Sequence, residues 1–315
     1  MTDLIKTGFR TKNGWGGQLS IHPETIIGQV QLKVKDLDQE VAFYQRVVGL
    51  QLNWRRSESA GLGSGQKDLL VLHNAPDGRR YQGVTGMYHF AILLPERREL
   101  ARCIARLMQM GYPNFPTNHV MTQTTYLEDP EGNQIELYVD TPEEGIFSFQ
   151  GGELVARRAN GTPSNGREAL NLESLLAELD SGDIEKLDQP MPSATIVGHV
   201  HLHVADLDES MMFYHNLLGF ENMGIGRTFR MGMVSAGGYH HHIGFNTWKG
   251  VGAPPPPPDA LGLHYFSIVF PDRSELLKVV DRVKSTEIPI HLEDKRWYLK
   301  DPSGNGILLK AQDQR

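Results

Sequence analysis

Residues Ile26–Leu52, IIGQVQLKVKDLDQEVAFYQRVVGLQL, return 170 residues later as Ile196–Asn222, IVGHVHLHVADLDESMMFYHNLLGFEN. The two stretches align without gaps and are identical at 11 of 27 positions. Each begins with the alternation typical of a strand and continues with apolar residues at the spacing of a helix. The chain therefore contains an internal duplication, and each copy opens with a strand and a helix.

Both predicted helices begin and end at the same residue types. Asp36 and Asp206 stand at the start, where a carboxylate can accept hydrogen bonds from the free N–H groups of the first turn. Gly49 and Gly219 stand at the end, where glycine readily adopts the left-handed conformation that stops a helix. We therefore expect the same strand, capped helix and turn in both copies.

Two more pairs of segments extend the repeat. Gly86–Leu100 aligns with Gly262–Leu276, and each indicates a strand, a proline and a helix. Tyr126–Leu137 aligns with Tyr298–Leu309, and each indicates two strands joined by a Pro-x-Gly-Asn turn. Apolar runs such as Tyr239–Phe245 supply further strands. The pattern predicts an α+β fold of four modules, each a strand, a helix and several strands.

The modules group into two repeated halves along the chain. The N-terminal half covers residues 1–140, with modules one and two at 26–83 and 84–140. The C-terminal half covers residues 196–315, with modules three and four at 196–253 and 259–315. The connector between them, residues 141–195, is rich in Gly, Asn and Pro and holds a short amphipathic helix candidate, Glu168–Leu179. Pro254–Pro258 is expected to be an extended polyproline segment between modules three and four.

The composition indicates an ordinary soluble protein, with 39% hydrophobic and 22% charged residues. A formal net charge of −7 does not favour nucleic-acid binding. No apolar run reaches the roughly 18 residues that span a bilayer, so no membrane segment is expected. Met1–Gly17 lacks the apolar core of a secretory signal, and the lone Cys103 excludes an intrachain disulfide. We expect a cytoplasmic protein.

The order of these motifs resembles the vicinal oxygen chelate superfamily, which includes glyoxalases, bleomycin-resistance proteins and extradiol ring-cleaving dioxygenases. The matching features are the opening strand, the DLD-x4-FY helix, the late Gly and the D-P-x-G-N turn, and they cover about residues 26–310. Three segments are most similar to the four-module catechol-2,3-dioxygenases: YHFAILLP at Tyr88–Pro95, GHVHLHV at Gly198–Val204 and GGYHHHIGFN at Gly237–Asn246. The resemblance implies βαβββ modules that pair into cupped, mixed β-sheets, with two facing modules enclosing a metal.

The family's metal ligands come from the opening strands of two facing modules and from a Glu on the last strand of one of them. The opening-strand positions here are Gln29, His89, His199 and Tyr265, and the last-strand positions of modules two and four are Glu136 and Leu308. Module two thus keeps both ligand types, whereas module four keeps neither. His264 stands one residue from the ligand position, so we expect it on the opposite face of its strand.

The third ligand comes from module one or module three. His199 stands fourteen residues before Phe213, which is the family's ligand spacing, and His201 and His203 share its face. With His89 and Glu136, His199 would form a facial triad for Fe(II), or Mn(II), that leaves adjacent positions open. Such a triad requires module two to face module three, across the two halves.

Gln29 is the alternative third ligand, as in some glyoxalases. Those enzymes also use a Glu at the end of module one. The candidate strand Leu69–His73 contains no carboxylate, which weakens this alternative.

The resemblance also implies roles for three residues around the metal. His241 matches the extradiol histidine that moves a proton and steadies the oxygen intermediate. Tyr126 stands ten residues before Glu136, the family spacing for a tyrosine that hydrogen-bonds a substrate oxygen. His119 lies upstream, where extradiol enzymes often carry another acid–base histidine.

The function that we predict is Fe(II)-dependent extradiol cleavage of catechol, or of a substituted catechol, with O2. Its partners would be a small aromatic diol and O2, without nucleic acid or membrane, in a homo-oligomer. The alternatives are a glyoxalase-like isomerase that uses Ni, Zn or Mn, and a non-enzymatic binding protein. The His–His–Glu set argues against the binding protein, because such modules lack metal ligands.

Overall fold

The computed structural model describes residues 20–312. The expectation for Met1–Gly17 lies outside the described residues. Within residues 20–312, no helix is both long and apolar enough to cross a membrane.

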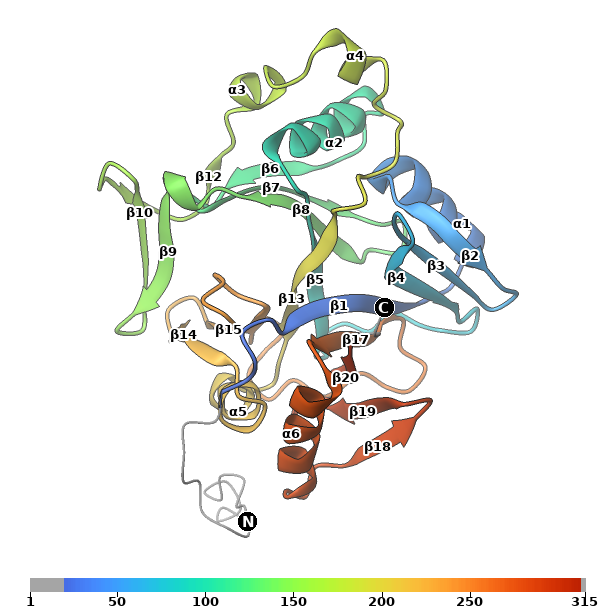
Figure 1. The fold of residues 1–315 in the computed structure, drawn as a ribbon, viewed down its shortest axis with the longest axis vertical. Coiled ribbons are helices and arrows are strands. Elements are labelled where there is room, and N and C mark those ends of the chain that lie inside the picture. The colour runs from blue at the N-terminus through green and yellow to red at the C-terminus, as the bar shows by residue number, and fades with distance from the viewer. Residues whose placement is uncertain (1–19, 313–315) are drawn as a thin grey trace.

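The four predicted modules are all present, each as a strand, a helix and three further strands (Figure 1). The opening strands are β1 (Ile26–Val34), β5 (Gly86–Leu93), β13 (Ile196–His203) and β17 (Gly262–Phe270). The helices that follow them are α1 (Leu37–Phe43), α2 (Arg97–Gln109), α5 (Leu207–Met211) and α6 (Arg273–Lys284). The later strands are β2 (Gln51–Arg55), β3 (Ser59–Ser64), β4 (Lys67–Asn74), β6 (Phe115–Asn118), β7 (Thr122–Glu128), β8 (Gln134–Asp140), β14 (Glu221–Gly226), β15 (Met231–Ser235), β16 (Ile243–Asn246), β18 (Ile290–Glu293), β19 (Arg296–Lys300) and β20 (Gly306–Ala311). The predicted α+β fold is confirmed.

Two mixed sheets are formed, and each combines one module from each half of the sequence. The eight-stranded sheet has the order β18-β19-β20-β17-β1-β4-β3-β2 and joins modules one and four. The nine-stranded sheet has the order β12-β6-β7-β8-β5-β13-β16-β15-β14 and joins modules two and three. Both joins are antiparallel pairings of opening strands, β1 with β17 and β5 with β13 (Figure 1). The halves of the sequence are therefore not the halves of the structure.

The predicted helix ends are found in both copies of the repeat, where each α-helix continues as a π-helical segment, Tyr44–Val48 or Met212–Leu217, before the closing glycine. The side chain of Asp36 accepts a hydrogen bond from the backbone N–H of Gln39, and that of Asp206 caps α5 in the same way. Gly49 and Gly219 have φ angles of 95° and 93°, the left-handed region that glycine adopts without strain.

A single apolar core joins the four modules. Leu32, Phe90, Leu202 and Phe266, one from each module, are fully buried in one contiguous cluster. Cys103 lies in α2 and is buried, as expected from its place in the apolar pattern. Because the modules share this core, burial of their apolar faces stabilises all of them together.

The secondary structure of the connector differs from the predicted one. The candidate helix Glu168–Leu179 is too long: α3 spans only Leu172–Leu176, and a second short helix, α4, spans Ser181–Ile184. Asn171 ends the preceding extended segment because its side chain caps α3 by accepting from the N–H of Ser174. Glu168–Ala169 instead form β12, which extends the nine-stranded sheet beside β6.

The connector also forms a three-stranded sheet that was not predicted from the sequence. Its strands are β9 (Gly145–Gln150), β10 (Glu153–Arg158) and β11 (Pro163–Ser164). In Figure 1 the β9–β10 hairpin projects from the end of β8, and β9 packs near β14. The connector is therefore a structured part of the nine-stranded side of the molecule.

The expected orientation of His264 is wrong. The pairing of β17 with β1 slips by one residue between Tyr265 and Leu263, which makes His264 the extra residue of a β-bulge. A bulge places two successive side chains on one side of the sheet. The ring centroids of His264 and Tyr265 are accordingly only 3.7 Å apart.

The predicted strand at Tyr239–Phe245 is also shorter than expected. Strand β16 begins only at Ile243, and residues 239–242 run irregularly ahead of it. The histidines of this segment are therefore not restricted to alternate faces.

The proline run lies where modules three and four meet. Pro254–Pro257 has no regular hydrogen-bonded structure, and Pro258 begins a turn. Pro255–Pro258 line a cavity of about 1500 Å³ between the two sheets. The run is thus both a link between modules and a wall of this cavity.

Candidate metal centre

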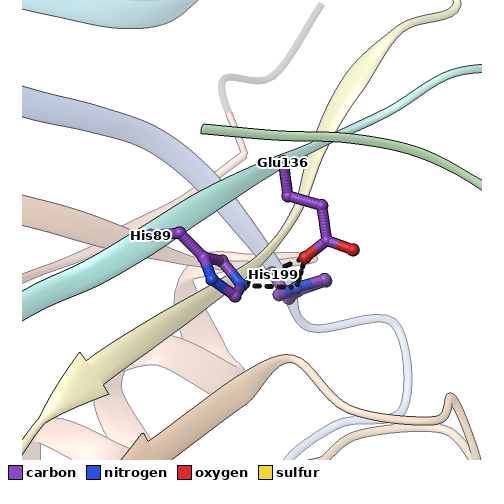
Figure 2. A group of neighbouring side chains, drawn as sticks. All are labelled: His89, Glu136 and His199. Carbon is purple, nitrogen blue, oxygen red and sulfur yellow. Dashed lines mark hydrogen bonds and ion pairs between the residues drawn. The ribbon is translucent and has the colours of Figure 1, made fainter. Parts of the chain in front are cut away.

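Three buried side chains from three strands meet in the nine-stranded sheet (Figure 2). Strand β5 carries His89, the antiparallel strand β13 carries His199, and the parallel strand β8 carries Glu136. The Nε2 atoms of His89 and His199 are 3.2 Å apart, and each lies 3.1 Å from Oε2 of Glu136. The cross-half pairing of modules two and three is what brings them together.

The spacing of these three atoms suits one face of an octahedral metal ion. With bonds of about 2.1 Å at right angles, neighbouring ligand atoms lie about 3.0 Å apart. The observed separations of 3.1–3.2 Å are close to that value. Two imidazoles and one carboxylate also suit Fe(II), and three positions would stay open for other ligands. The donor set therefore fits a divalent transition metal.

Electrostatics keep the cluster in the form that a metal requires. Burial opposes ionisation of Glu136, but hydrogen bonds from His199 and His89 hold the pKa of its carboxyl well below the usual range. Burial lowers the pKa of His199 to about 4, so its imidazole is neutral at pH 7. A carboxylate and a neutral imidazole are the protonation states that bind metal.

The two candidate ligand histidines are oriented by packing. Their Nδ1 atoms are buried and have no hydrogen-bond partner among the described residues. The ring of His89 lies 5.7 Å from that of Tyr126, and the ring of His199 lies 5.0 Å from that of Tyr138. Aromatic contacts thus take the place of the outer hydrogen bonds that usually orient a metal-binding imidazole.

The alternative ligands point elsewhere. Nε2 of His201 and Nδ1 of His203 both hydrogen-bond the side-chain amide of Asn246. Gln29 lies in the eight-stranded sheet, where its Oε1 accepts a hydrogen bond from Gln31. Gln29 therefore does not join His89 and Glu136.

Tyr126 and His119 form a hydrogen-bonded pair beside the three ligand candidates. Tyr126 is the cross-strand neighbour of Glu136 in the β7–β8 ladder. Nδ1–H of His119 donates to the carbonyl of Gly166, so its Nε2, 2.9 Å from the hydroxyl of Tyr126, is free to accept. Burial and the charge of Glu136 raise the pKa of Tyr126 well above its ordinary value, so the phenol stays protonated.

His241 reaches the cluster from the irregular segment ahead of β16. Its ring centroid is 4.2 Å from that of His199. Burial lowers the pKa of His241 well below its ordinary value, so the ring is neutral at pH 7. The six site residues named from the sequence therefore all line one pocket: His89, His119, Tyr126, Glu136, His199 and His241.

The pocket holds about 190 Å³, and its outer walls are mostly apolar. Its apolar lining comes from modules two and three and from the connector: Met121, Phe147, Phe149, Leu154, Phe229, Met231, Met233 and Trp248. The connector residues were not among the site residues predicted from the sequence. The alternating pattern of Gly145–Gln150, GIFSFQ, was the available signal, because it is typical of a strand with one apolar face.

Comparison with known proteins gives the same family as the sequence motifs. The family model described as Glyoxalase/Bleomycin resistance protein/Dioxygenase superfamily matches residues 26–137 and 196–309. A catechol-2,3-dioxygenase of Bacillus subtilis (strain 168) is 39% identical over 286 residues, which are 90% of this chain and 96% of the relative. Biphenyl-2,3-diol 1,2-dioxygenase 3 of Rhodococcus globerulus is 27% identical over 39% of this chain and 68% of its own length.

Among solved structures, glyoxalase I from Zea mays has the same fold, with a TM-score of 0.54 at 17% identity, covering 91% of this chain and 92% of that one. The family model accounts for both halves of the duplication and for all four modules. The chain belongs to the glyoxalase, bleomycin resistance protein and dioxygenase superfamily.

Proposed function

We propose that the protein is an Fe(II)-dependent extradiol dioxygenase that cleaves catechol, or a substituted catechol, with O2. The supporting observation is the cluster of His89, Glu136 and His199 in the lining of a pocket of about 190 Å³ that is also lined by aromatic side chains. The 39% identity to a catechol-2,3-dioxygenase over 90% of the chain supports the same class.

The three ligand candidates would hold the iron, and the other pocket residues would handle the substrate. Bound Fe(II) would supply adjacent coordination positions for the diol and O2 and the capacity for electron transfer between them. His241, with a neutral ring, would accept a hydroxyl proton of the diol. Tyr126 would turn its one O–H from His119 to donate a hydrogen bond to a substrate oxygen. The apolar walls would limit the access of water.

The test is oxygen uptake by protein that has been reconstituted with Fe(II) under anaerobic conditions and then mixed with catechol and air. We expect one O2 consumed per catechol and a yellow ring-fission product. Parallel reconstitution with Mn(II) distinguishes the two metals. Oxygen uptake equal to that of the His89→Ala variant would reject the proposal.

A glyoxalase-like isomerase is the second candidate, because the maize glyoxalase I fold matches nearly the whole chain. The absence of Gln29 from the cluster does not favour it. Protein reconstituted with Ni(II) or Zn(II) and assayed with a glutathione hemithioacetal tests this candidate directly. Assembly into a homo-oligomer and location in the cytoplasm stay predictions.

A further inference from the structure

The three consecutive histidines of module three have three different environments. Nδ1 of His242 accepts hydrogen bonds from the hydroxyl of Ser235 and the backbone N–H of Ala236, at 3.0 and 3.2 Å. His241 lines the metal pocket. His240 also lines this pocket, and its Nδ1 lies 2.7 Å from Nδ1 of His241. The proposed function assigns no role to His240.

His240 connects His241 to a carboxylate. Its Nε2 lies 3.1 Å from Oδ1 of Asp140, which ends β8 four residues after Glu136. The same oxygen accepts a hydrogen bond from the hydroxyl of Tyr239 at 3.1 Å. The side chain of His240 is 8% exposed and that of Asp140 is 32% exposed, so the chain of contacts leads from the pocket toward the surface.

The hydrogen bonds that connect Asp140, His240 and His241 have only one possible arrangement of donors and acceptors when both imidazole rings are neutral. A carboxylate only accepts, so Nε2 of His240 must carry the hydrogen that bonds Asp140. A neutral imidazole has one N–H, so Nδ1 of His240 is then bare and accepts from Nδ1–H of His241. Nε2 of His241 is consequently the bare nitrogen.

We propose that Asp140 and His240 are positioning residues that hold His241 as its Nδ1–H tautomer, with Nε2 free to take a proton in the pocket. The role in turnover rests on the proposed function. In that role, one proton leaves a catechol hydroxyl and binds Nε2 of His241. The ring becomes an imidazolium, and the substrate oxygen keeps the electron pair and a negative charge.

The tautomer matters because the opposite one presents an N–H and cannot accept that proton. In Ser-His-Asp triads, loss of the orienting carboxylate leaves the geometry intact but produces the wrong tautomer and lowers kcat by about 10⁴. Here the carboxylate of Asp140 acts through the imidazole of His240 and is partly exposed, so we expect a smaller fall in kcat when it is removed.

The direct test is NMR of protein labelled with ¹⁵N-histidine, without metal or substrate. Long-range ¹H–¹⁵N correlations show which nitrogen of His241 carries hydrogen, with His241→Asn used to assign its signals. We expect Nδ1–H in the unmodified protein and a mixture of tautomers in Asp140→Leu, which has similar size and no acceptor. Hydrogen on Nε2 of His241 in the unmodified protein, or an unchanged tautomer in Asp140→Leu, would overturn the proposal.

Tyr239→Phe is the matched control. It removes another hydrogen bond to Asp140 and leaves the carboxylate beside His240, so His241 should stay Nδ1–H. His240→Phe is a second variant in case Asp140→Leu does not fold; it keeps a flat ring and removes both nitrogens, and it should give the same mixture.

Kinetics test the role in turnover. In Asp140→Leu we expect kcat for catechol to fall about tenfold to a hundredfold, with KM and iron content nearly unchanged, because the change affects proton transfer and not substrate binding. An unchanged kcat in Asp140→Leu would show that Asp140 does not contribute to proton transfer during turnover. If the unmodified protein cleaves no catechol, the proposed function fails, while the NMR result still decides the tautomer.

Discussion

The eight-stranded and nine-stranded sheets form the two cups of the molecule. They have the same strand pairing but carry different residues at the three positions that correspond to the candidate ligands. In the nine-stranded sheet these positions hold His89, Glu136 and His199; in the eight-stranded sheet they hold Tyr265, Leu308 and Gln29. Both opening-strand pairs are antiparallel and both carry a bulge at the same place, at Tyr88 and at His264. The backbone arrangement therefore does not by itself create a metal centre, and the side chains at three positions decide it.

The two halves of the sequence share a buried hydrogen bond that joins their two modules and therefore links one cup to the other. The hydroxyl of Tyr44 donates to Asp129 and that of Tyr214 donates to Asp301, each at 2.9 Å. A shared residue type can also be used differently. Tyr126 hydrogen-bonds His119, whereas the matching Tyr298 stacks on His291 with ring centroids 5.3 Å apart. Matching hydrogen bonds therefore link the two cups in both halves, whereas the cups differ at the candidate ligand positions.

Substitution of a candidate metal ligand is expected to have the largest effect on metal affinity and on catechol turnover. Glu136→Gln keeps the size of the side chain and removes the charge, so metal affinity should fall more than about a hundredfold, and turnover should be lost. The measurement is metal content after dialysis, together with catechol turnover. Tyr265→Phe, at the position of His89 in the other cup, is the control and should keep full metal content. Equal metal content in Glu136→Gln and the unmodified protein would contradict the assignment.

The two tyrosines at the matched positions should respond differently. Tyr126→Phe removes a hydrogen bond to a charged substrate oxygen, worth about 1.5–3 kcal/mol, so kcat should fall about tenfold to a hundredfold. Tyr298→Phe should leave kcat unchanged because Tyr298 lies in the cup without ligands. Steady-state kinetics of both variants with catechol are the measurement, and equal losses would show that the position serves packing in both cups.

Connector side chains line the pocket of the nine-stranded cup and not the cavity beside the proline run, and this difference predicts an effect on substrate binding. Phe147→Ala removes an aromatic wall of the pocket, so KM for catechol should rise about threefold to tenfold, with kcat little changed. Ile146→Ala is the matched control, since Ile146 precedes Phe147 on β9 and is 48% exposed. A higher KM in both variants would indicate that the connector hairpin acts as a whole and not through this ring.

The smallest effect on activity, and a clear one on stability, is expected at Glu40. Burial and the charge of Asp129 raise the pKa of Glu40 from 4.5 to about 9, whereas the repeat places Ser210 at the matching position. The folded protein thus keeps this carboxyl protonated at pH 7, and the unfolded chain ionises it. The resulting stability is fully present below pH 4.5 and is lost as pH rises toward 9.

Glu40→Gln should therefore raise the free energy of unfolding by about 1–2 kcal/mol at pH 8 and by less at pH 5.5. Urea unfolding at the two pH values measures the difference, with catechol turnover as the check that the site is intact. Glu40→Ser, the residue of the matching module, is the second variant. A loss of stability at pH 8 in Glu40→Gln would contradict the raised pKa.

The local features of the fold could be predicted from the sequence. Asp36 and Gly49 bound their helix as expected because capping and left-handed glycine act within a few residues of the chain. Comparison of the repeated segments also selected His89 and Glu136 in module two over their counterparts in module four. These results needed only neighbouring residues, the alignment of one half with the other, and the ligand positions that the family resemblance implies.

The remaining features depend on contacts between residues far apart in the chain. The alternation of a strand determines which residues share a face, but not which distant strand becomes its neighbour, and a one-residue bulge reverses that face, as at His264. The contribution of Phe147 to the pocket and the contact of His240 with Asp140 arise in the same way. The sequence by itself thus determined the modules and the candidate ligands, while the pairing of modules across the halves decided where those ligands meet.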